Sequence, residues 1–269
     1  MNLAPRTGSG PFWLEKWYID TLMPSGDVLL VYLGWLRLLG LTMARVTAEL
    51  FRADGSHQRG WAAAPTITGG EDLLRFGPAR IEGRSLSWET DGLSGELRFE
   101  PRHGPVRLRE PFLRSGRRQL HWTIEIPDAD VEGEVRWPGG SASVTGRGYR
   151  DRVCFDLPPW RFPIRELRWG RAVASDHAAV WVDARCVHGA VRARWEDGTV
   201  IPDDTAPPMK SKERVLLETD VVDLDGMRLG WLRPVFRRLP LNPHEVKWHS
   251  GFQLSGEDGY GVHERVVWR

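Results

Sequence analysis

Cysteine is scarce in this chain: its 269 residues include only Cys154 and Cys186. Two cysteines give no disulfide framework. A hydrophobic content of 41% is ample for a core in one large or two small domains. The composition therefore favours a folded protein in a reducing cytoplasm.

An excess of charge of one sign is also missing, because 37 Lys and Arg residues face 36 Asp and Glu residues. No broad electrostatic field draws such a chain to nucleic acid or to anionic lipid, so a polyanionic partner is disfavoured. The cations are nearly all arginines, which suit buried ion pairs. The lysines are Lys16, Lys210, Lys212 and Lys247.

No hydrophobic run is long enough for a membrane helix. The longest, residues 28–41, contains Arg37 and has about 14 residues, against the roughly 20 that a span requires. Residues 1–10 lack the charged and then apolar layout of a signal peptide. We therefore expect buried core, no transmembrane segment and a cytoplasmic location, with peripheral membrane contact left open.

The motifs of several enzyme classes are absent. There is no G-x-S-x-G elbow, no P-loop and no dinucleotide fingerprint, since the G-x-G at residues 146–148 lacks a third glycine. The residues that could bind a metal lack C-x-x-C and H-E-x-x-H spacing; they are Cys154, Cys186, His188, His244 and His249. Hydrolase, kinase and dehydrogenase activities lose their main support, and we expect neither a metal nor a cofactor.

What the sequence does contain is short apolar and polar alternation, separated by Gly, Pro, Asp and Asn. Such alternation predicts half-buried strands, and examples begin at Ala44, Ser94, Leu120, Val131 and Ala178. No window has a capped helical period apart from a helical turn over residues 231–237. Strands every 8–15 residues predict an all-β barrel or sandwich fold.

Two breaks interrupt this pattern. The basic turn at residues 114–118 predicts a boundary between an N-terminal domain, 1–118, and a C-terminal domain, 119–269. The Pro-rich, charged segment 201–213 predicts a surface loop. Each half has the size of a small β-barrel, so a cavity inside or between the halves is plausible. Fourteen tryptophans, which bury about 150–250 Å² each, either fill cores or contact a ligand.

Several segments occur in an order that resembles the hydroxyneurosporene synthase (carotenoid 1,2-hydratase) family. The most specific is Gly146-Arg-Gly-Tyr149-Arg-Asp151, followed by Arg168-Trp-Gly-Arg171-Ala and an apolar strand at 178–183. Trp17-Tyr-Ile-Asp resembles the opening of the family, and residues 259–268 resemble its closing strand. The resemblance covers most of the chain in order.

The resemblance implies two lipocalin-like β domains packed together with a ligand cavity. It also implies functional roles for His121, Trp122, Tyr149 and Asp151, which match family positions one by one. The chain departs from the family at Val153, where an Asn is usual. Related lipocalin-like proteins include cyclases and Diels–Alderases of natural-product pathways, because one scaffold serves several reactions.

Tyr149 and Asp151 are two residues apart, so on a strand they share a face. In an apolar interior, desolvation raises a carboxyl pKa above its reference of about 3.9 and keeps the acid protonated. Asp151 could then protonate an alkene while the faces of Trp122, Tyr149 and Trp169 stabilise positive charge. His121 could hold a water or tune Asp151.

The alternative structural interpretation is a turn-stabilising hydrogen bond from Tyr149, with Asp151 ion-paired to an arginine and its pKa lowered. The candidate arginines are Arg147, Arg150, Arg152 and Arg171. Three functions stay open: an acid-catalysed hydratase or cyclase, a pericyclase, or a carrier of hydrophobic small molecules. The expected catalytic residues are Asp151, Tyr149 and His121, and the expected substrate-binding residues are Trp122, Trp169, Arg171, Trp17, Tyr32 and Trp35.

Overall fold

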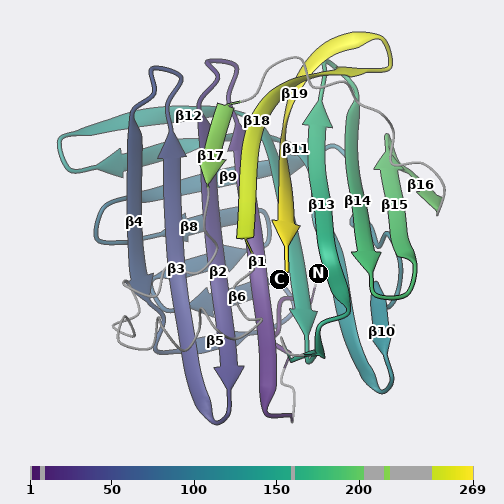
Figure 1. The fold of residues 1–269 in the computed structure, drawn as a ribbon. Coiled ribbons are helices and arrows are strands. Elements are labelled where there is room, and N and C mark those ends of the chain that lie inside the picture. The colour runs from purple at the N-terminus through teal and green to yellow at the C-terminus, as the bar shows by residue number, and fades with distance from the viewer. Residues whose placement is uncertain (1, 7–9, 159–160, 203–214, 219–243, 269) are drawn as a thin grey trace. The chain divides into compact units, whose positions relative to one another are not determined.

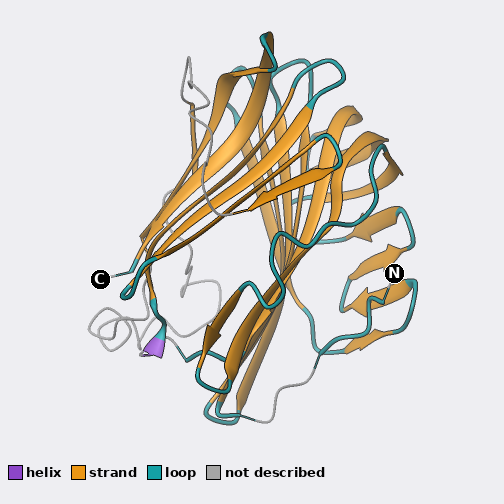
Figure 2. Cartoon of the chain, turned by 90° about the vertical axis from the view of Figure 1, so that its right-hand side faces the viewer, coloured by secondary structure: helices purple, strands orange, loops and turns teal. Residues whose placement is uncertain are grey.

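The computed structural model describes residues 2–6, 10–158, 161–202, 215–218 and 244–268. These residues form 19 strands and no α-helix, which confirms the all-β prediction. The short helical piece drawn in Figure 2 is a 3₁₀ turn at Arg161. None of them belongs to a helix that is long and apolar enough to cross a membrane. The predicted helical turn at 231–237 lies outside the described residues, and so does most of the predicted loop at 201–213.

The chain divides into two compact units. The first comprises Met1–Pro111 and Arg118–Asp156, and the second comprises Phe112–Arg117 and Leu157–Arg269. This division differs from the boundary expected after residue 118, because the two long strands that follow that residue hydrogen-bond to strands of the N-terminal half. The Gly-Tyr-x-Asp strand thus belongs to the first unit.

The first unit contains a curled sheet with the strand order β4-β3-β2-β1-β12-β11-β9-β8-β7-β6-β5. Strands β1 to β4 lie side by side in the purple-to-blue part of the ribbon (Figure 1). The long strands are β1 (Phe12–Leu22), β2 (Val28–Leu38), β3 (Leu41–Phe51), β4 (His57–Ala63), β9 (Ser94–Pro101), β11 (Arg118–Trp137) and β12 (Gly140–Phe155). The short strands are β5 (Ile67–Gly69), β6 (Leu73–Phe76), β7 (Ala79–Glu82) and β8 (Ser85–Trp88). Strand β10 (Leu113–Ser115) pairs with β11 but falls in the residue range of the second unit.

The second unit contains a sheet with the strand order β16-β15-β14-β13-β19-β18-β17, and all of its neighbouring strands are antiparallel. Its strands are β13 (Ile164–Val173), β14 (Ala178–Cys186), β15 (Ala190–Glu196), β16 (Thr199–Pro202), β17 (Val215–Glu218), β18 (His244–Leu254) and β19 (Glu257–Val267).

Two-residue turns set the register of three hairpins. Leu39-Gly40 joins β2 to β3, Asp197-Gly198 joins β15 to β16, and Ser255-Gly256 joins β18 to β19. Both residues of each pair have positive φ, which is the geometry that matches the twist of the flanking strands. Leu39 is exposed at its turn, so the apolar run 28–41 is a strand and a hairpin turn and not one continuous core segment.

The two faces of β1 and β12 have different roles in the first unit. One face of β1 places Trp17 and Ile19 in the hydrophobic core of this unit. On the same face, β12 carries Arg150 and Arg152, which are almost wholly buried. The opposite face carries the residues at even positions of β1 and odd positions of β12.

Each arginine on the core face has a buried carboxylate partner. Nε of Arg150 lies 2.9 Å from Glu125, and Nε of Arg152 donates a 2.7 Å hydrogen bond to Glu15. Arg152 also donates to the carbonyls of Asn2 and Ala4. These contacts attach the N-terminal segment to the core.

Removing one partner of a buried ion pair leaves an uncompensated charge. We therefore expect Arg150→Met to lower the free energy of unfolding by about 3–5 kcal/mol, because Glu125 keeps its buried carboxyl. The double variant Arg150→Met/Glu125→Leu should recover most of that loss, since it removes both charges of this ion pair. Urea denaturation of both variants measures the difference, and equal stability of the single variant and the wild type would contradict it.

Candidate functional site

Two Tyr-x-Asp segments meet at the pairing of β1 with β12. Tyr18 of β1 is the register partner of Asp151, and Asp20 of β1 is the register partner of Tyr149. Because residues two apart on a strand share a face, these four side chains lie on one face of the sheet. All four are buried. We call them the tyrosine–aspartate quartet.

Asp151 is held by two donors that bind the same oxygen. The Tyr149 hydroxyl donates a 2.8 Å hydrogen bond to Oδ2 of Asp151, and the indole Nε1–H of Trp122 donates another of 2.8 Å to that atom. Trp122 reaches Asp151 from β11, where it pairs with Val153. The predicted association of Trp122, Tyr149 and Asp151 is therefore present in the structure.

The environment of Tyr149 keeps its phenol neutral. Burial raises the pKa of Tyr149 well above its ordinary value, and the neighbouring Asp151, its hydrogen bond to Asp151, Asp20 and Tyr18 raise it further. A neutral phenol keeps its proton, so Tyr149 remains a hydrogen-bond donor at physiological pH.

Aromatic rings extend the site along β1 and β2. The ring centroid of Tyr18 lies 6.0 Å from that of Tyr149 and 5.2 Å from that of Tyr32, its register partner on β2. The ammonium of Lys16 lies 4.7 Å from the Tyr32 centroid and 5.8 Å from the Tyr18 centroid. Tyr32, an expected substrate-binding residue, thus shares a face with Asp151.

Three of the four arginines that were candidate partners of Asp151 form ion pairs with other carboxylates. Nε of Arg147 donates a 2.9 Å hydrogen bond to the buried Asp128, while Arg150 pairs with Glu125 and Arg152 with Glu15. The fourth candidate, Arg171, lies on β13 of the second unit. The hydrogen bond from Tyr149 that the structural interpretation required is present.

His121 does not face Asp151. It is adjacent to Trp122 on β11 and therefore points to the opposite face, where it pairs in register with Cys154. Its Nδ1 is hydrogen-bonded to the carboxylate of Glu110. The predicted role of His121 in tuning Asp151 is thus corrected by strand alternation, which sequence adjacency to Trp122 had obscured.

Trp17 and Trp35 also lie on the core face rather than beside Asp151. Trp17 is fully buried in the core, with its ring edge-on to Phe76 at 6.0 Å and the guanidinium of Arg152 at 4.7 Å. Trp35 packs against the same core. Their predicted substrate contact is corrected to core packing, since alternation sends them to the face opposite Tyr18 and Tyr32.

Trp169 and Arg171 belong to β13 of the second unit and are buried there. Trp169 is the register partner of Glu264 on β19, and Glu264 is in turn the register partner of Lys247 on β18. The Lys247 ammonium is buried, forms ion pairs with Glu264 and Glu245, and lies 5.8 Å from the centroid of Trp169. Within this unit, Trp169 therefore packs beside a buried ion-pair cluster.

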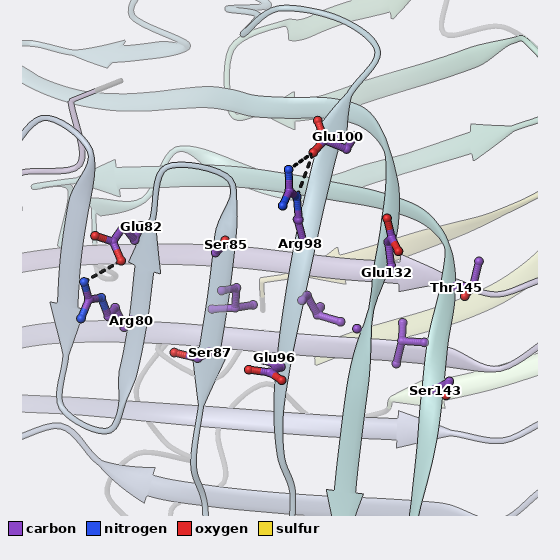
Figure 3. Close-up of a pocket in the computed structure, with 14 residues that line it drawn as sticks. Arg80, Glu82, Ser85, Ser87, Glu96, Arg98, Glu100, Glu132, Ser143 and Thr145 are labelled. Carbon is purple, nitrogen blue, oxygen red and sulfur yellow. Dashed lines mark hydrogen bonds and ion pairs between the residues drawn. The ribbon is translucent and has the colours of Figure 1, made fainter.

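The pocket in Figure 3 lies elsewhere in the first unit and has a volume of about 960 Å³. Most of its lining residues are polar side chains of β7, β8, β9, β11 and β12, such as Arg98, Glu132 and Ser143, and no aromatic residue lines it. None of the predicted site residues takes part. Among the described residues, no group of three or more His, Cys, Asp and Glu side chains could hold a metal ion.

The sequence analysis missed Tyr18, Asp20 and Lys16. A signal for the first two was present, because the Tyr-x-Asp spacing of the Gly-Tyr-x-Asp motif recurs in Trp17-Tyr-Ile-Asp20. What the sequence did not show was the register that places each tyrosine opposite an aspartate.

No family model matches the sequence, and no curated protein matches it. Three solved structures are similar in fold. CghA with Sch210972 has a TM-score of 0.63 and 12% identity, over 96% of this chain and 89% of that chain. A candidate AttH protein, NE1406 of Nitrosomonas europaea, has a TM-score of 0.57 and 14% identity, over 95% and 93%. Kievitone hydratase from Nectria haematococca has a TM-score of 0.54 and 12% identity, over 96% and 89%. At these identities the likeness shows the fold, and the lipocalin-like β architecture expected from the sequence is confirmed.

Proposed function

We propose that the protein is an enzyme, a hydratase or cyclase, that acts on an unsaturated and largely apolar small molecule. Asp151 is the group that protonates or polarises the substrate. The observation that carries this proposal is the convergence of Tyr149 and Trp122 on one oxygen of the buried Asp151.

Two donors on Oδ2 divide the roles of the two carboxyl oxygens. In a protonated carboxyl group, one oxygen carries the proton and the other is a pure acceptor. Since Oδ2 accepts hydrogen bonds from Tyr149 and Trp122, the acid form of Asp151 carries its proton on Oδ1. The same two donors fix the plane of the carboxyl group, so the O–H bond at Oδ1 points in a fixed direction toward the substrate.

The reaction balances without a cofactor. The Oδ1–H bond of Asp151 breaks as a C–H bond forms on one alkene carbon, which leaves a carbocation and a carboxylate. Attack by water followed by loss of a proton to Asp151 gives an alcohol, whereas attack by another alkene of the substrate and proton loss gives a ring. The faces of Tyr18, Tyr32 and Trp122 can stabilise the positive charge as it develops.

The structural neighbours agree with this class of activity. One of them is named a hydratase, and another was solved with the small molecule Sch210972. A pericyclase is the second candidate. Because Tyr149 and Trp122 both donate to Oδ2, the Oδ1–H of the acid form of Asp151 can polarise a carbonyl of a folded polyene without transferring its proton.

Replacing the acid with its amide tests the role of Asp151. Asp151→Asn keeps an acceptor oxygen for Tyr149 and Trp122 but has no acidic proton, so turnover of a probe alkene such as kievitone or neurosporene should fall by about 10²–10⁴-fold. Asp20→Asn, which changes the other buried aspartate of the quartet in the same way, is the matched control and should cost far less. Circular dichroism checks that both variants fold. Wild-type turnover by Asp151→Asn would eliminate the acid role.

Turnover in heavy water separates the candidate reactions. If an alkene is protonated, deuterium from the exchanged carboxyl of Asp151 enters a product carbon, and mass spectrometry detects a gain of one mass unit at that carbon. A pericyclic reaction gives product without carbon-bound deuterium. Recovery of unchanged ligand after prolonged incubation indicates a carrier and contradicts an enzymatic role.

The raised pKa of Tyr149 predicts the pH behaviour of the site. A phenol that stays protonated does not change the rate with pH. Because the pKa of Tyr149 lies well above its ordinary value of about 10, ionisation of Tyr149 causes no loss of rate up to about pH 10. Tyr149→Phe should therefore lower the rate about 10- to 100-fold by removing one donor to Asp151, without adding or removing a limb of the kcat–pH profile. An alkaline limb that disappears in Tyr149→Phe would show that the phenol ionises.

A further inference from the structure

Lys16 is a cation on the same face as the tyrosine–aspartate quartet. It is the register partner of Val153 on β12 and of Gly34 on β2. The next row along the face contains Asp151, Tyr18 and Tyr32. Lys16 and Asp151 are thus diagonal neighbours on adjacent strands, with a Cα separation of about 7–8 Å.

The ammonium of Lys16 rests on aromatic rings and not on an acid. It lies 4.7 Å from the centroid of Tyr32 and 5.8 Å from that of Tyr18. Within the described part of the chain, no carboxylate forms an ion pair with it. Ring faces hold a cation in place but do not neutralise it, so the ammonium keeps donors for an anion.

Space for such an anion is open beside Lys16, over Gly34. A Cβ atom at Gly34 would meet no other atom of the described chain within 4 Å, and the φ of Gly34 does not lie in the left-handed region. Because the φ of Gly34 is one that any residue can adopt, backbone geometry does not require a glycine here. Glycine in a strand interior also costs about 0.5–1 kcal/mol relative to alanine. An interior glycine often marks a bulge, a tight bend, or a place where a ligand or another backbone approaches closely. The pairing of β2 with β1 and β3 runs through Gly34 without a register shift, so no bulge accounts for this glycine.

We infer that Lys16, Tyr32 and Gly34 form a subsite for an anionic head group of the substrate. The inference rests on the proposed function, because it assigns the unsaturated part of the substrate to Asp151. The substrate class is then an unsaturated carbon skeleton that carries an anionic group such as a carboxylate. The ammonium binds the anion while the backbone at Gly34 leaves room for it, which fixes the direction in which the skeleton enters.

A matched pair of polyene probes tests the charge preference. cis-Parinaric acid carries a conjugated chain and a carboxylate, and its methyl ester has the same chain without the charge. The wild type should bind the acid at least about tenfold more tightly than the ester by fluorescence titration. Lys16→Met should lose this preference by weakening acid binding while ester affinity changes less than about twofold, and Lys16→Arg should restore it.

The space above Gly34 is tested separately. Gly34→Leu fills the open volume without strain on φ, so it should weaken binding of acid and ester alike by at least about tenfold. Gly104→Leu is the matched control, because Gly104 also has open space around its Cβ position and is exposed. Wild-type binding by Gly34→Leu would overturn the position of the subsite.

The outcomes distinguish this inference from the proposed function. Equal loss of acid and ester binding in Lys16→Met would show a merely structural lysine, and unchanged acid binding would overturn the anion subsite. Asp151→Asn should keep the preference for the acid over the ester, because it alters the reacting end alone. If Asp151→Asn retains catalysis while Lys16→Met loses acid binding, the acid mechanism fails and the subsite stands; the reverse result removes the subsite and leaves the mechanism.

Discussion

The antiparallel register between β1 and β12 is the constraint on which the site depends. It sets Tyr18 opposite Asp151 and Asp20 opposite Tyr149. A shift of one residue in this pairing would turn every side chain of one strand to the other face. The quartet would then lose two members, and their polar groups would enter the core. The register of β1 and β12 and the hydrogen bonds of their buried polar side chains therefore stabilise each other.

The same strands keep their charged residues in two separate environments. On the core face, Arg150 and Arg152 of β12 form ion pairs with Glu125 and Glu15, so each buried charge has a partner of opposite sign. On the opposite face, Asp151 receives neutral donors from Tyr149 and Trp122. These two hydrogen bonds orient the carboxyl group of Asp151. The first face thus carries the ion pairs that hold the core together, and the second carries the quartet.

Local patterns predicted a good part of this arrangement. Alternation predicted the strands, and the spacing of Tyr149 and Asp151 predicted that they share a face, as they do. Predictions based on sequence adjacency were less accurate, because neighbouring residues on a strand point to opposite faces. His121 points away from the face of Trp122, and Trp17 lies in the core on the face opposite Tyr18. The compact units also divide the chain elsewhere than at residue 118, because turn residues mark the end of a strand but do not show which sheet the next strand joins.

The sequence by itself determined the all-β class, the hairpins with a glycine as second turn residue, and the members of each strand face, because these depend on neighbours one to three residues apart. The tertiary structure decided which strands pair and in what register. It brought residues 16–20 of β1 beside residues 149–153 of β12, and so assembled Lys16 and the quartet on one face. Contacts between segments more than a hundred residues apart result from the packing of the whole sheet, which no local pattern encodes.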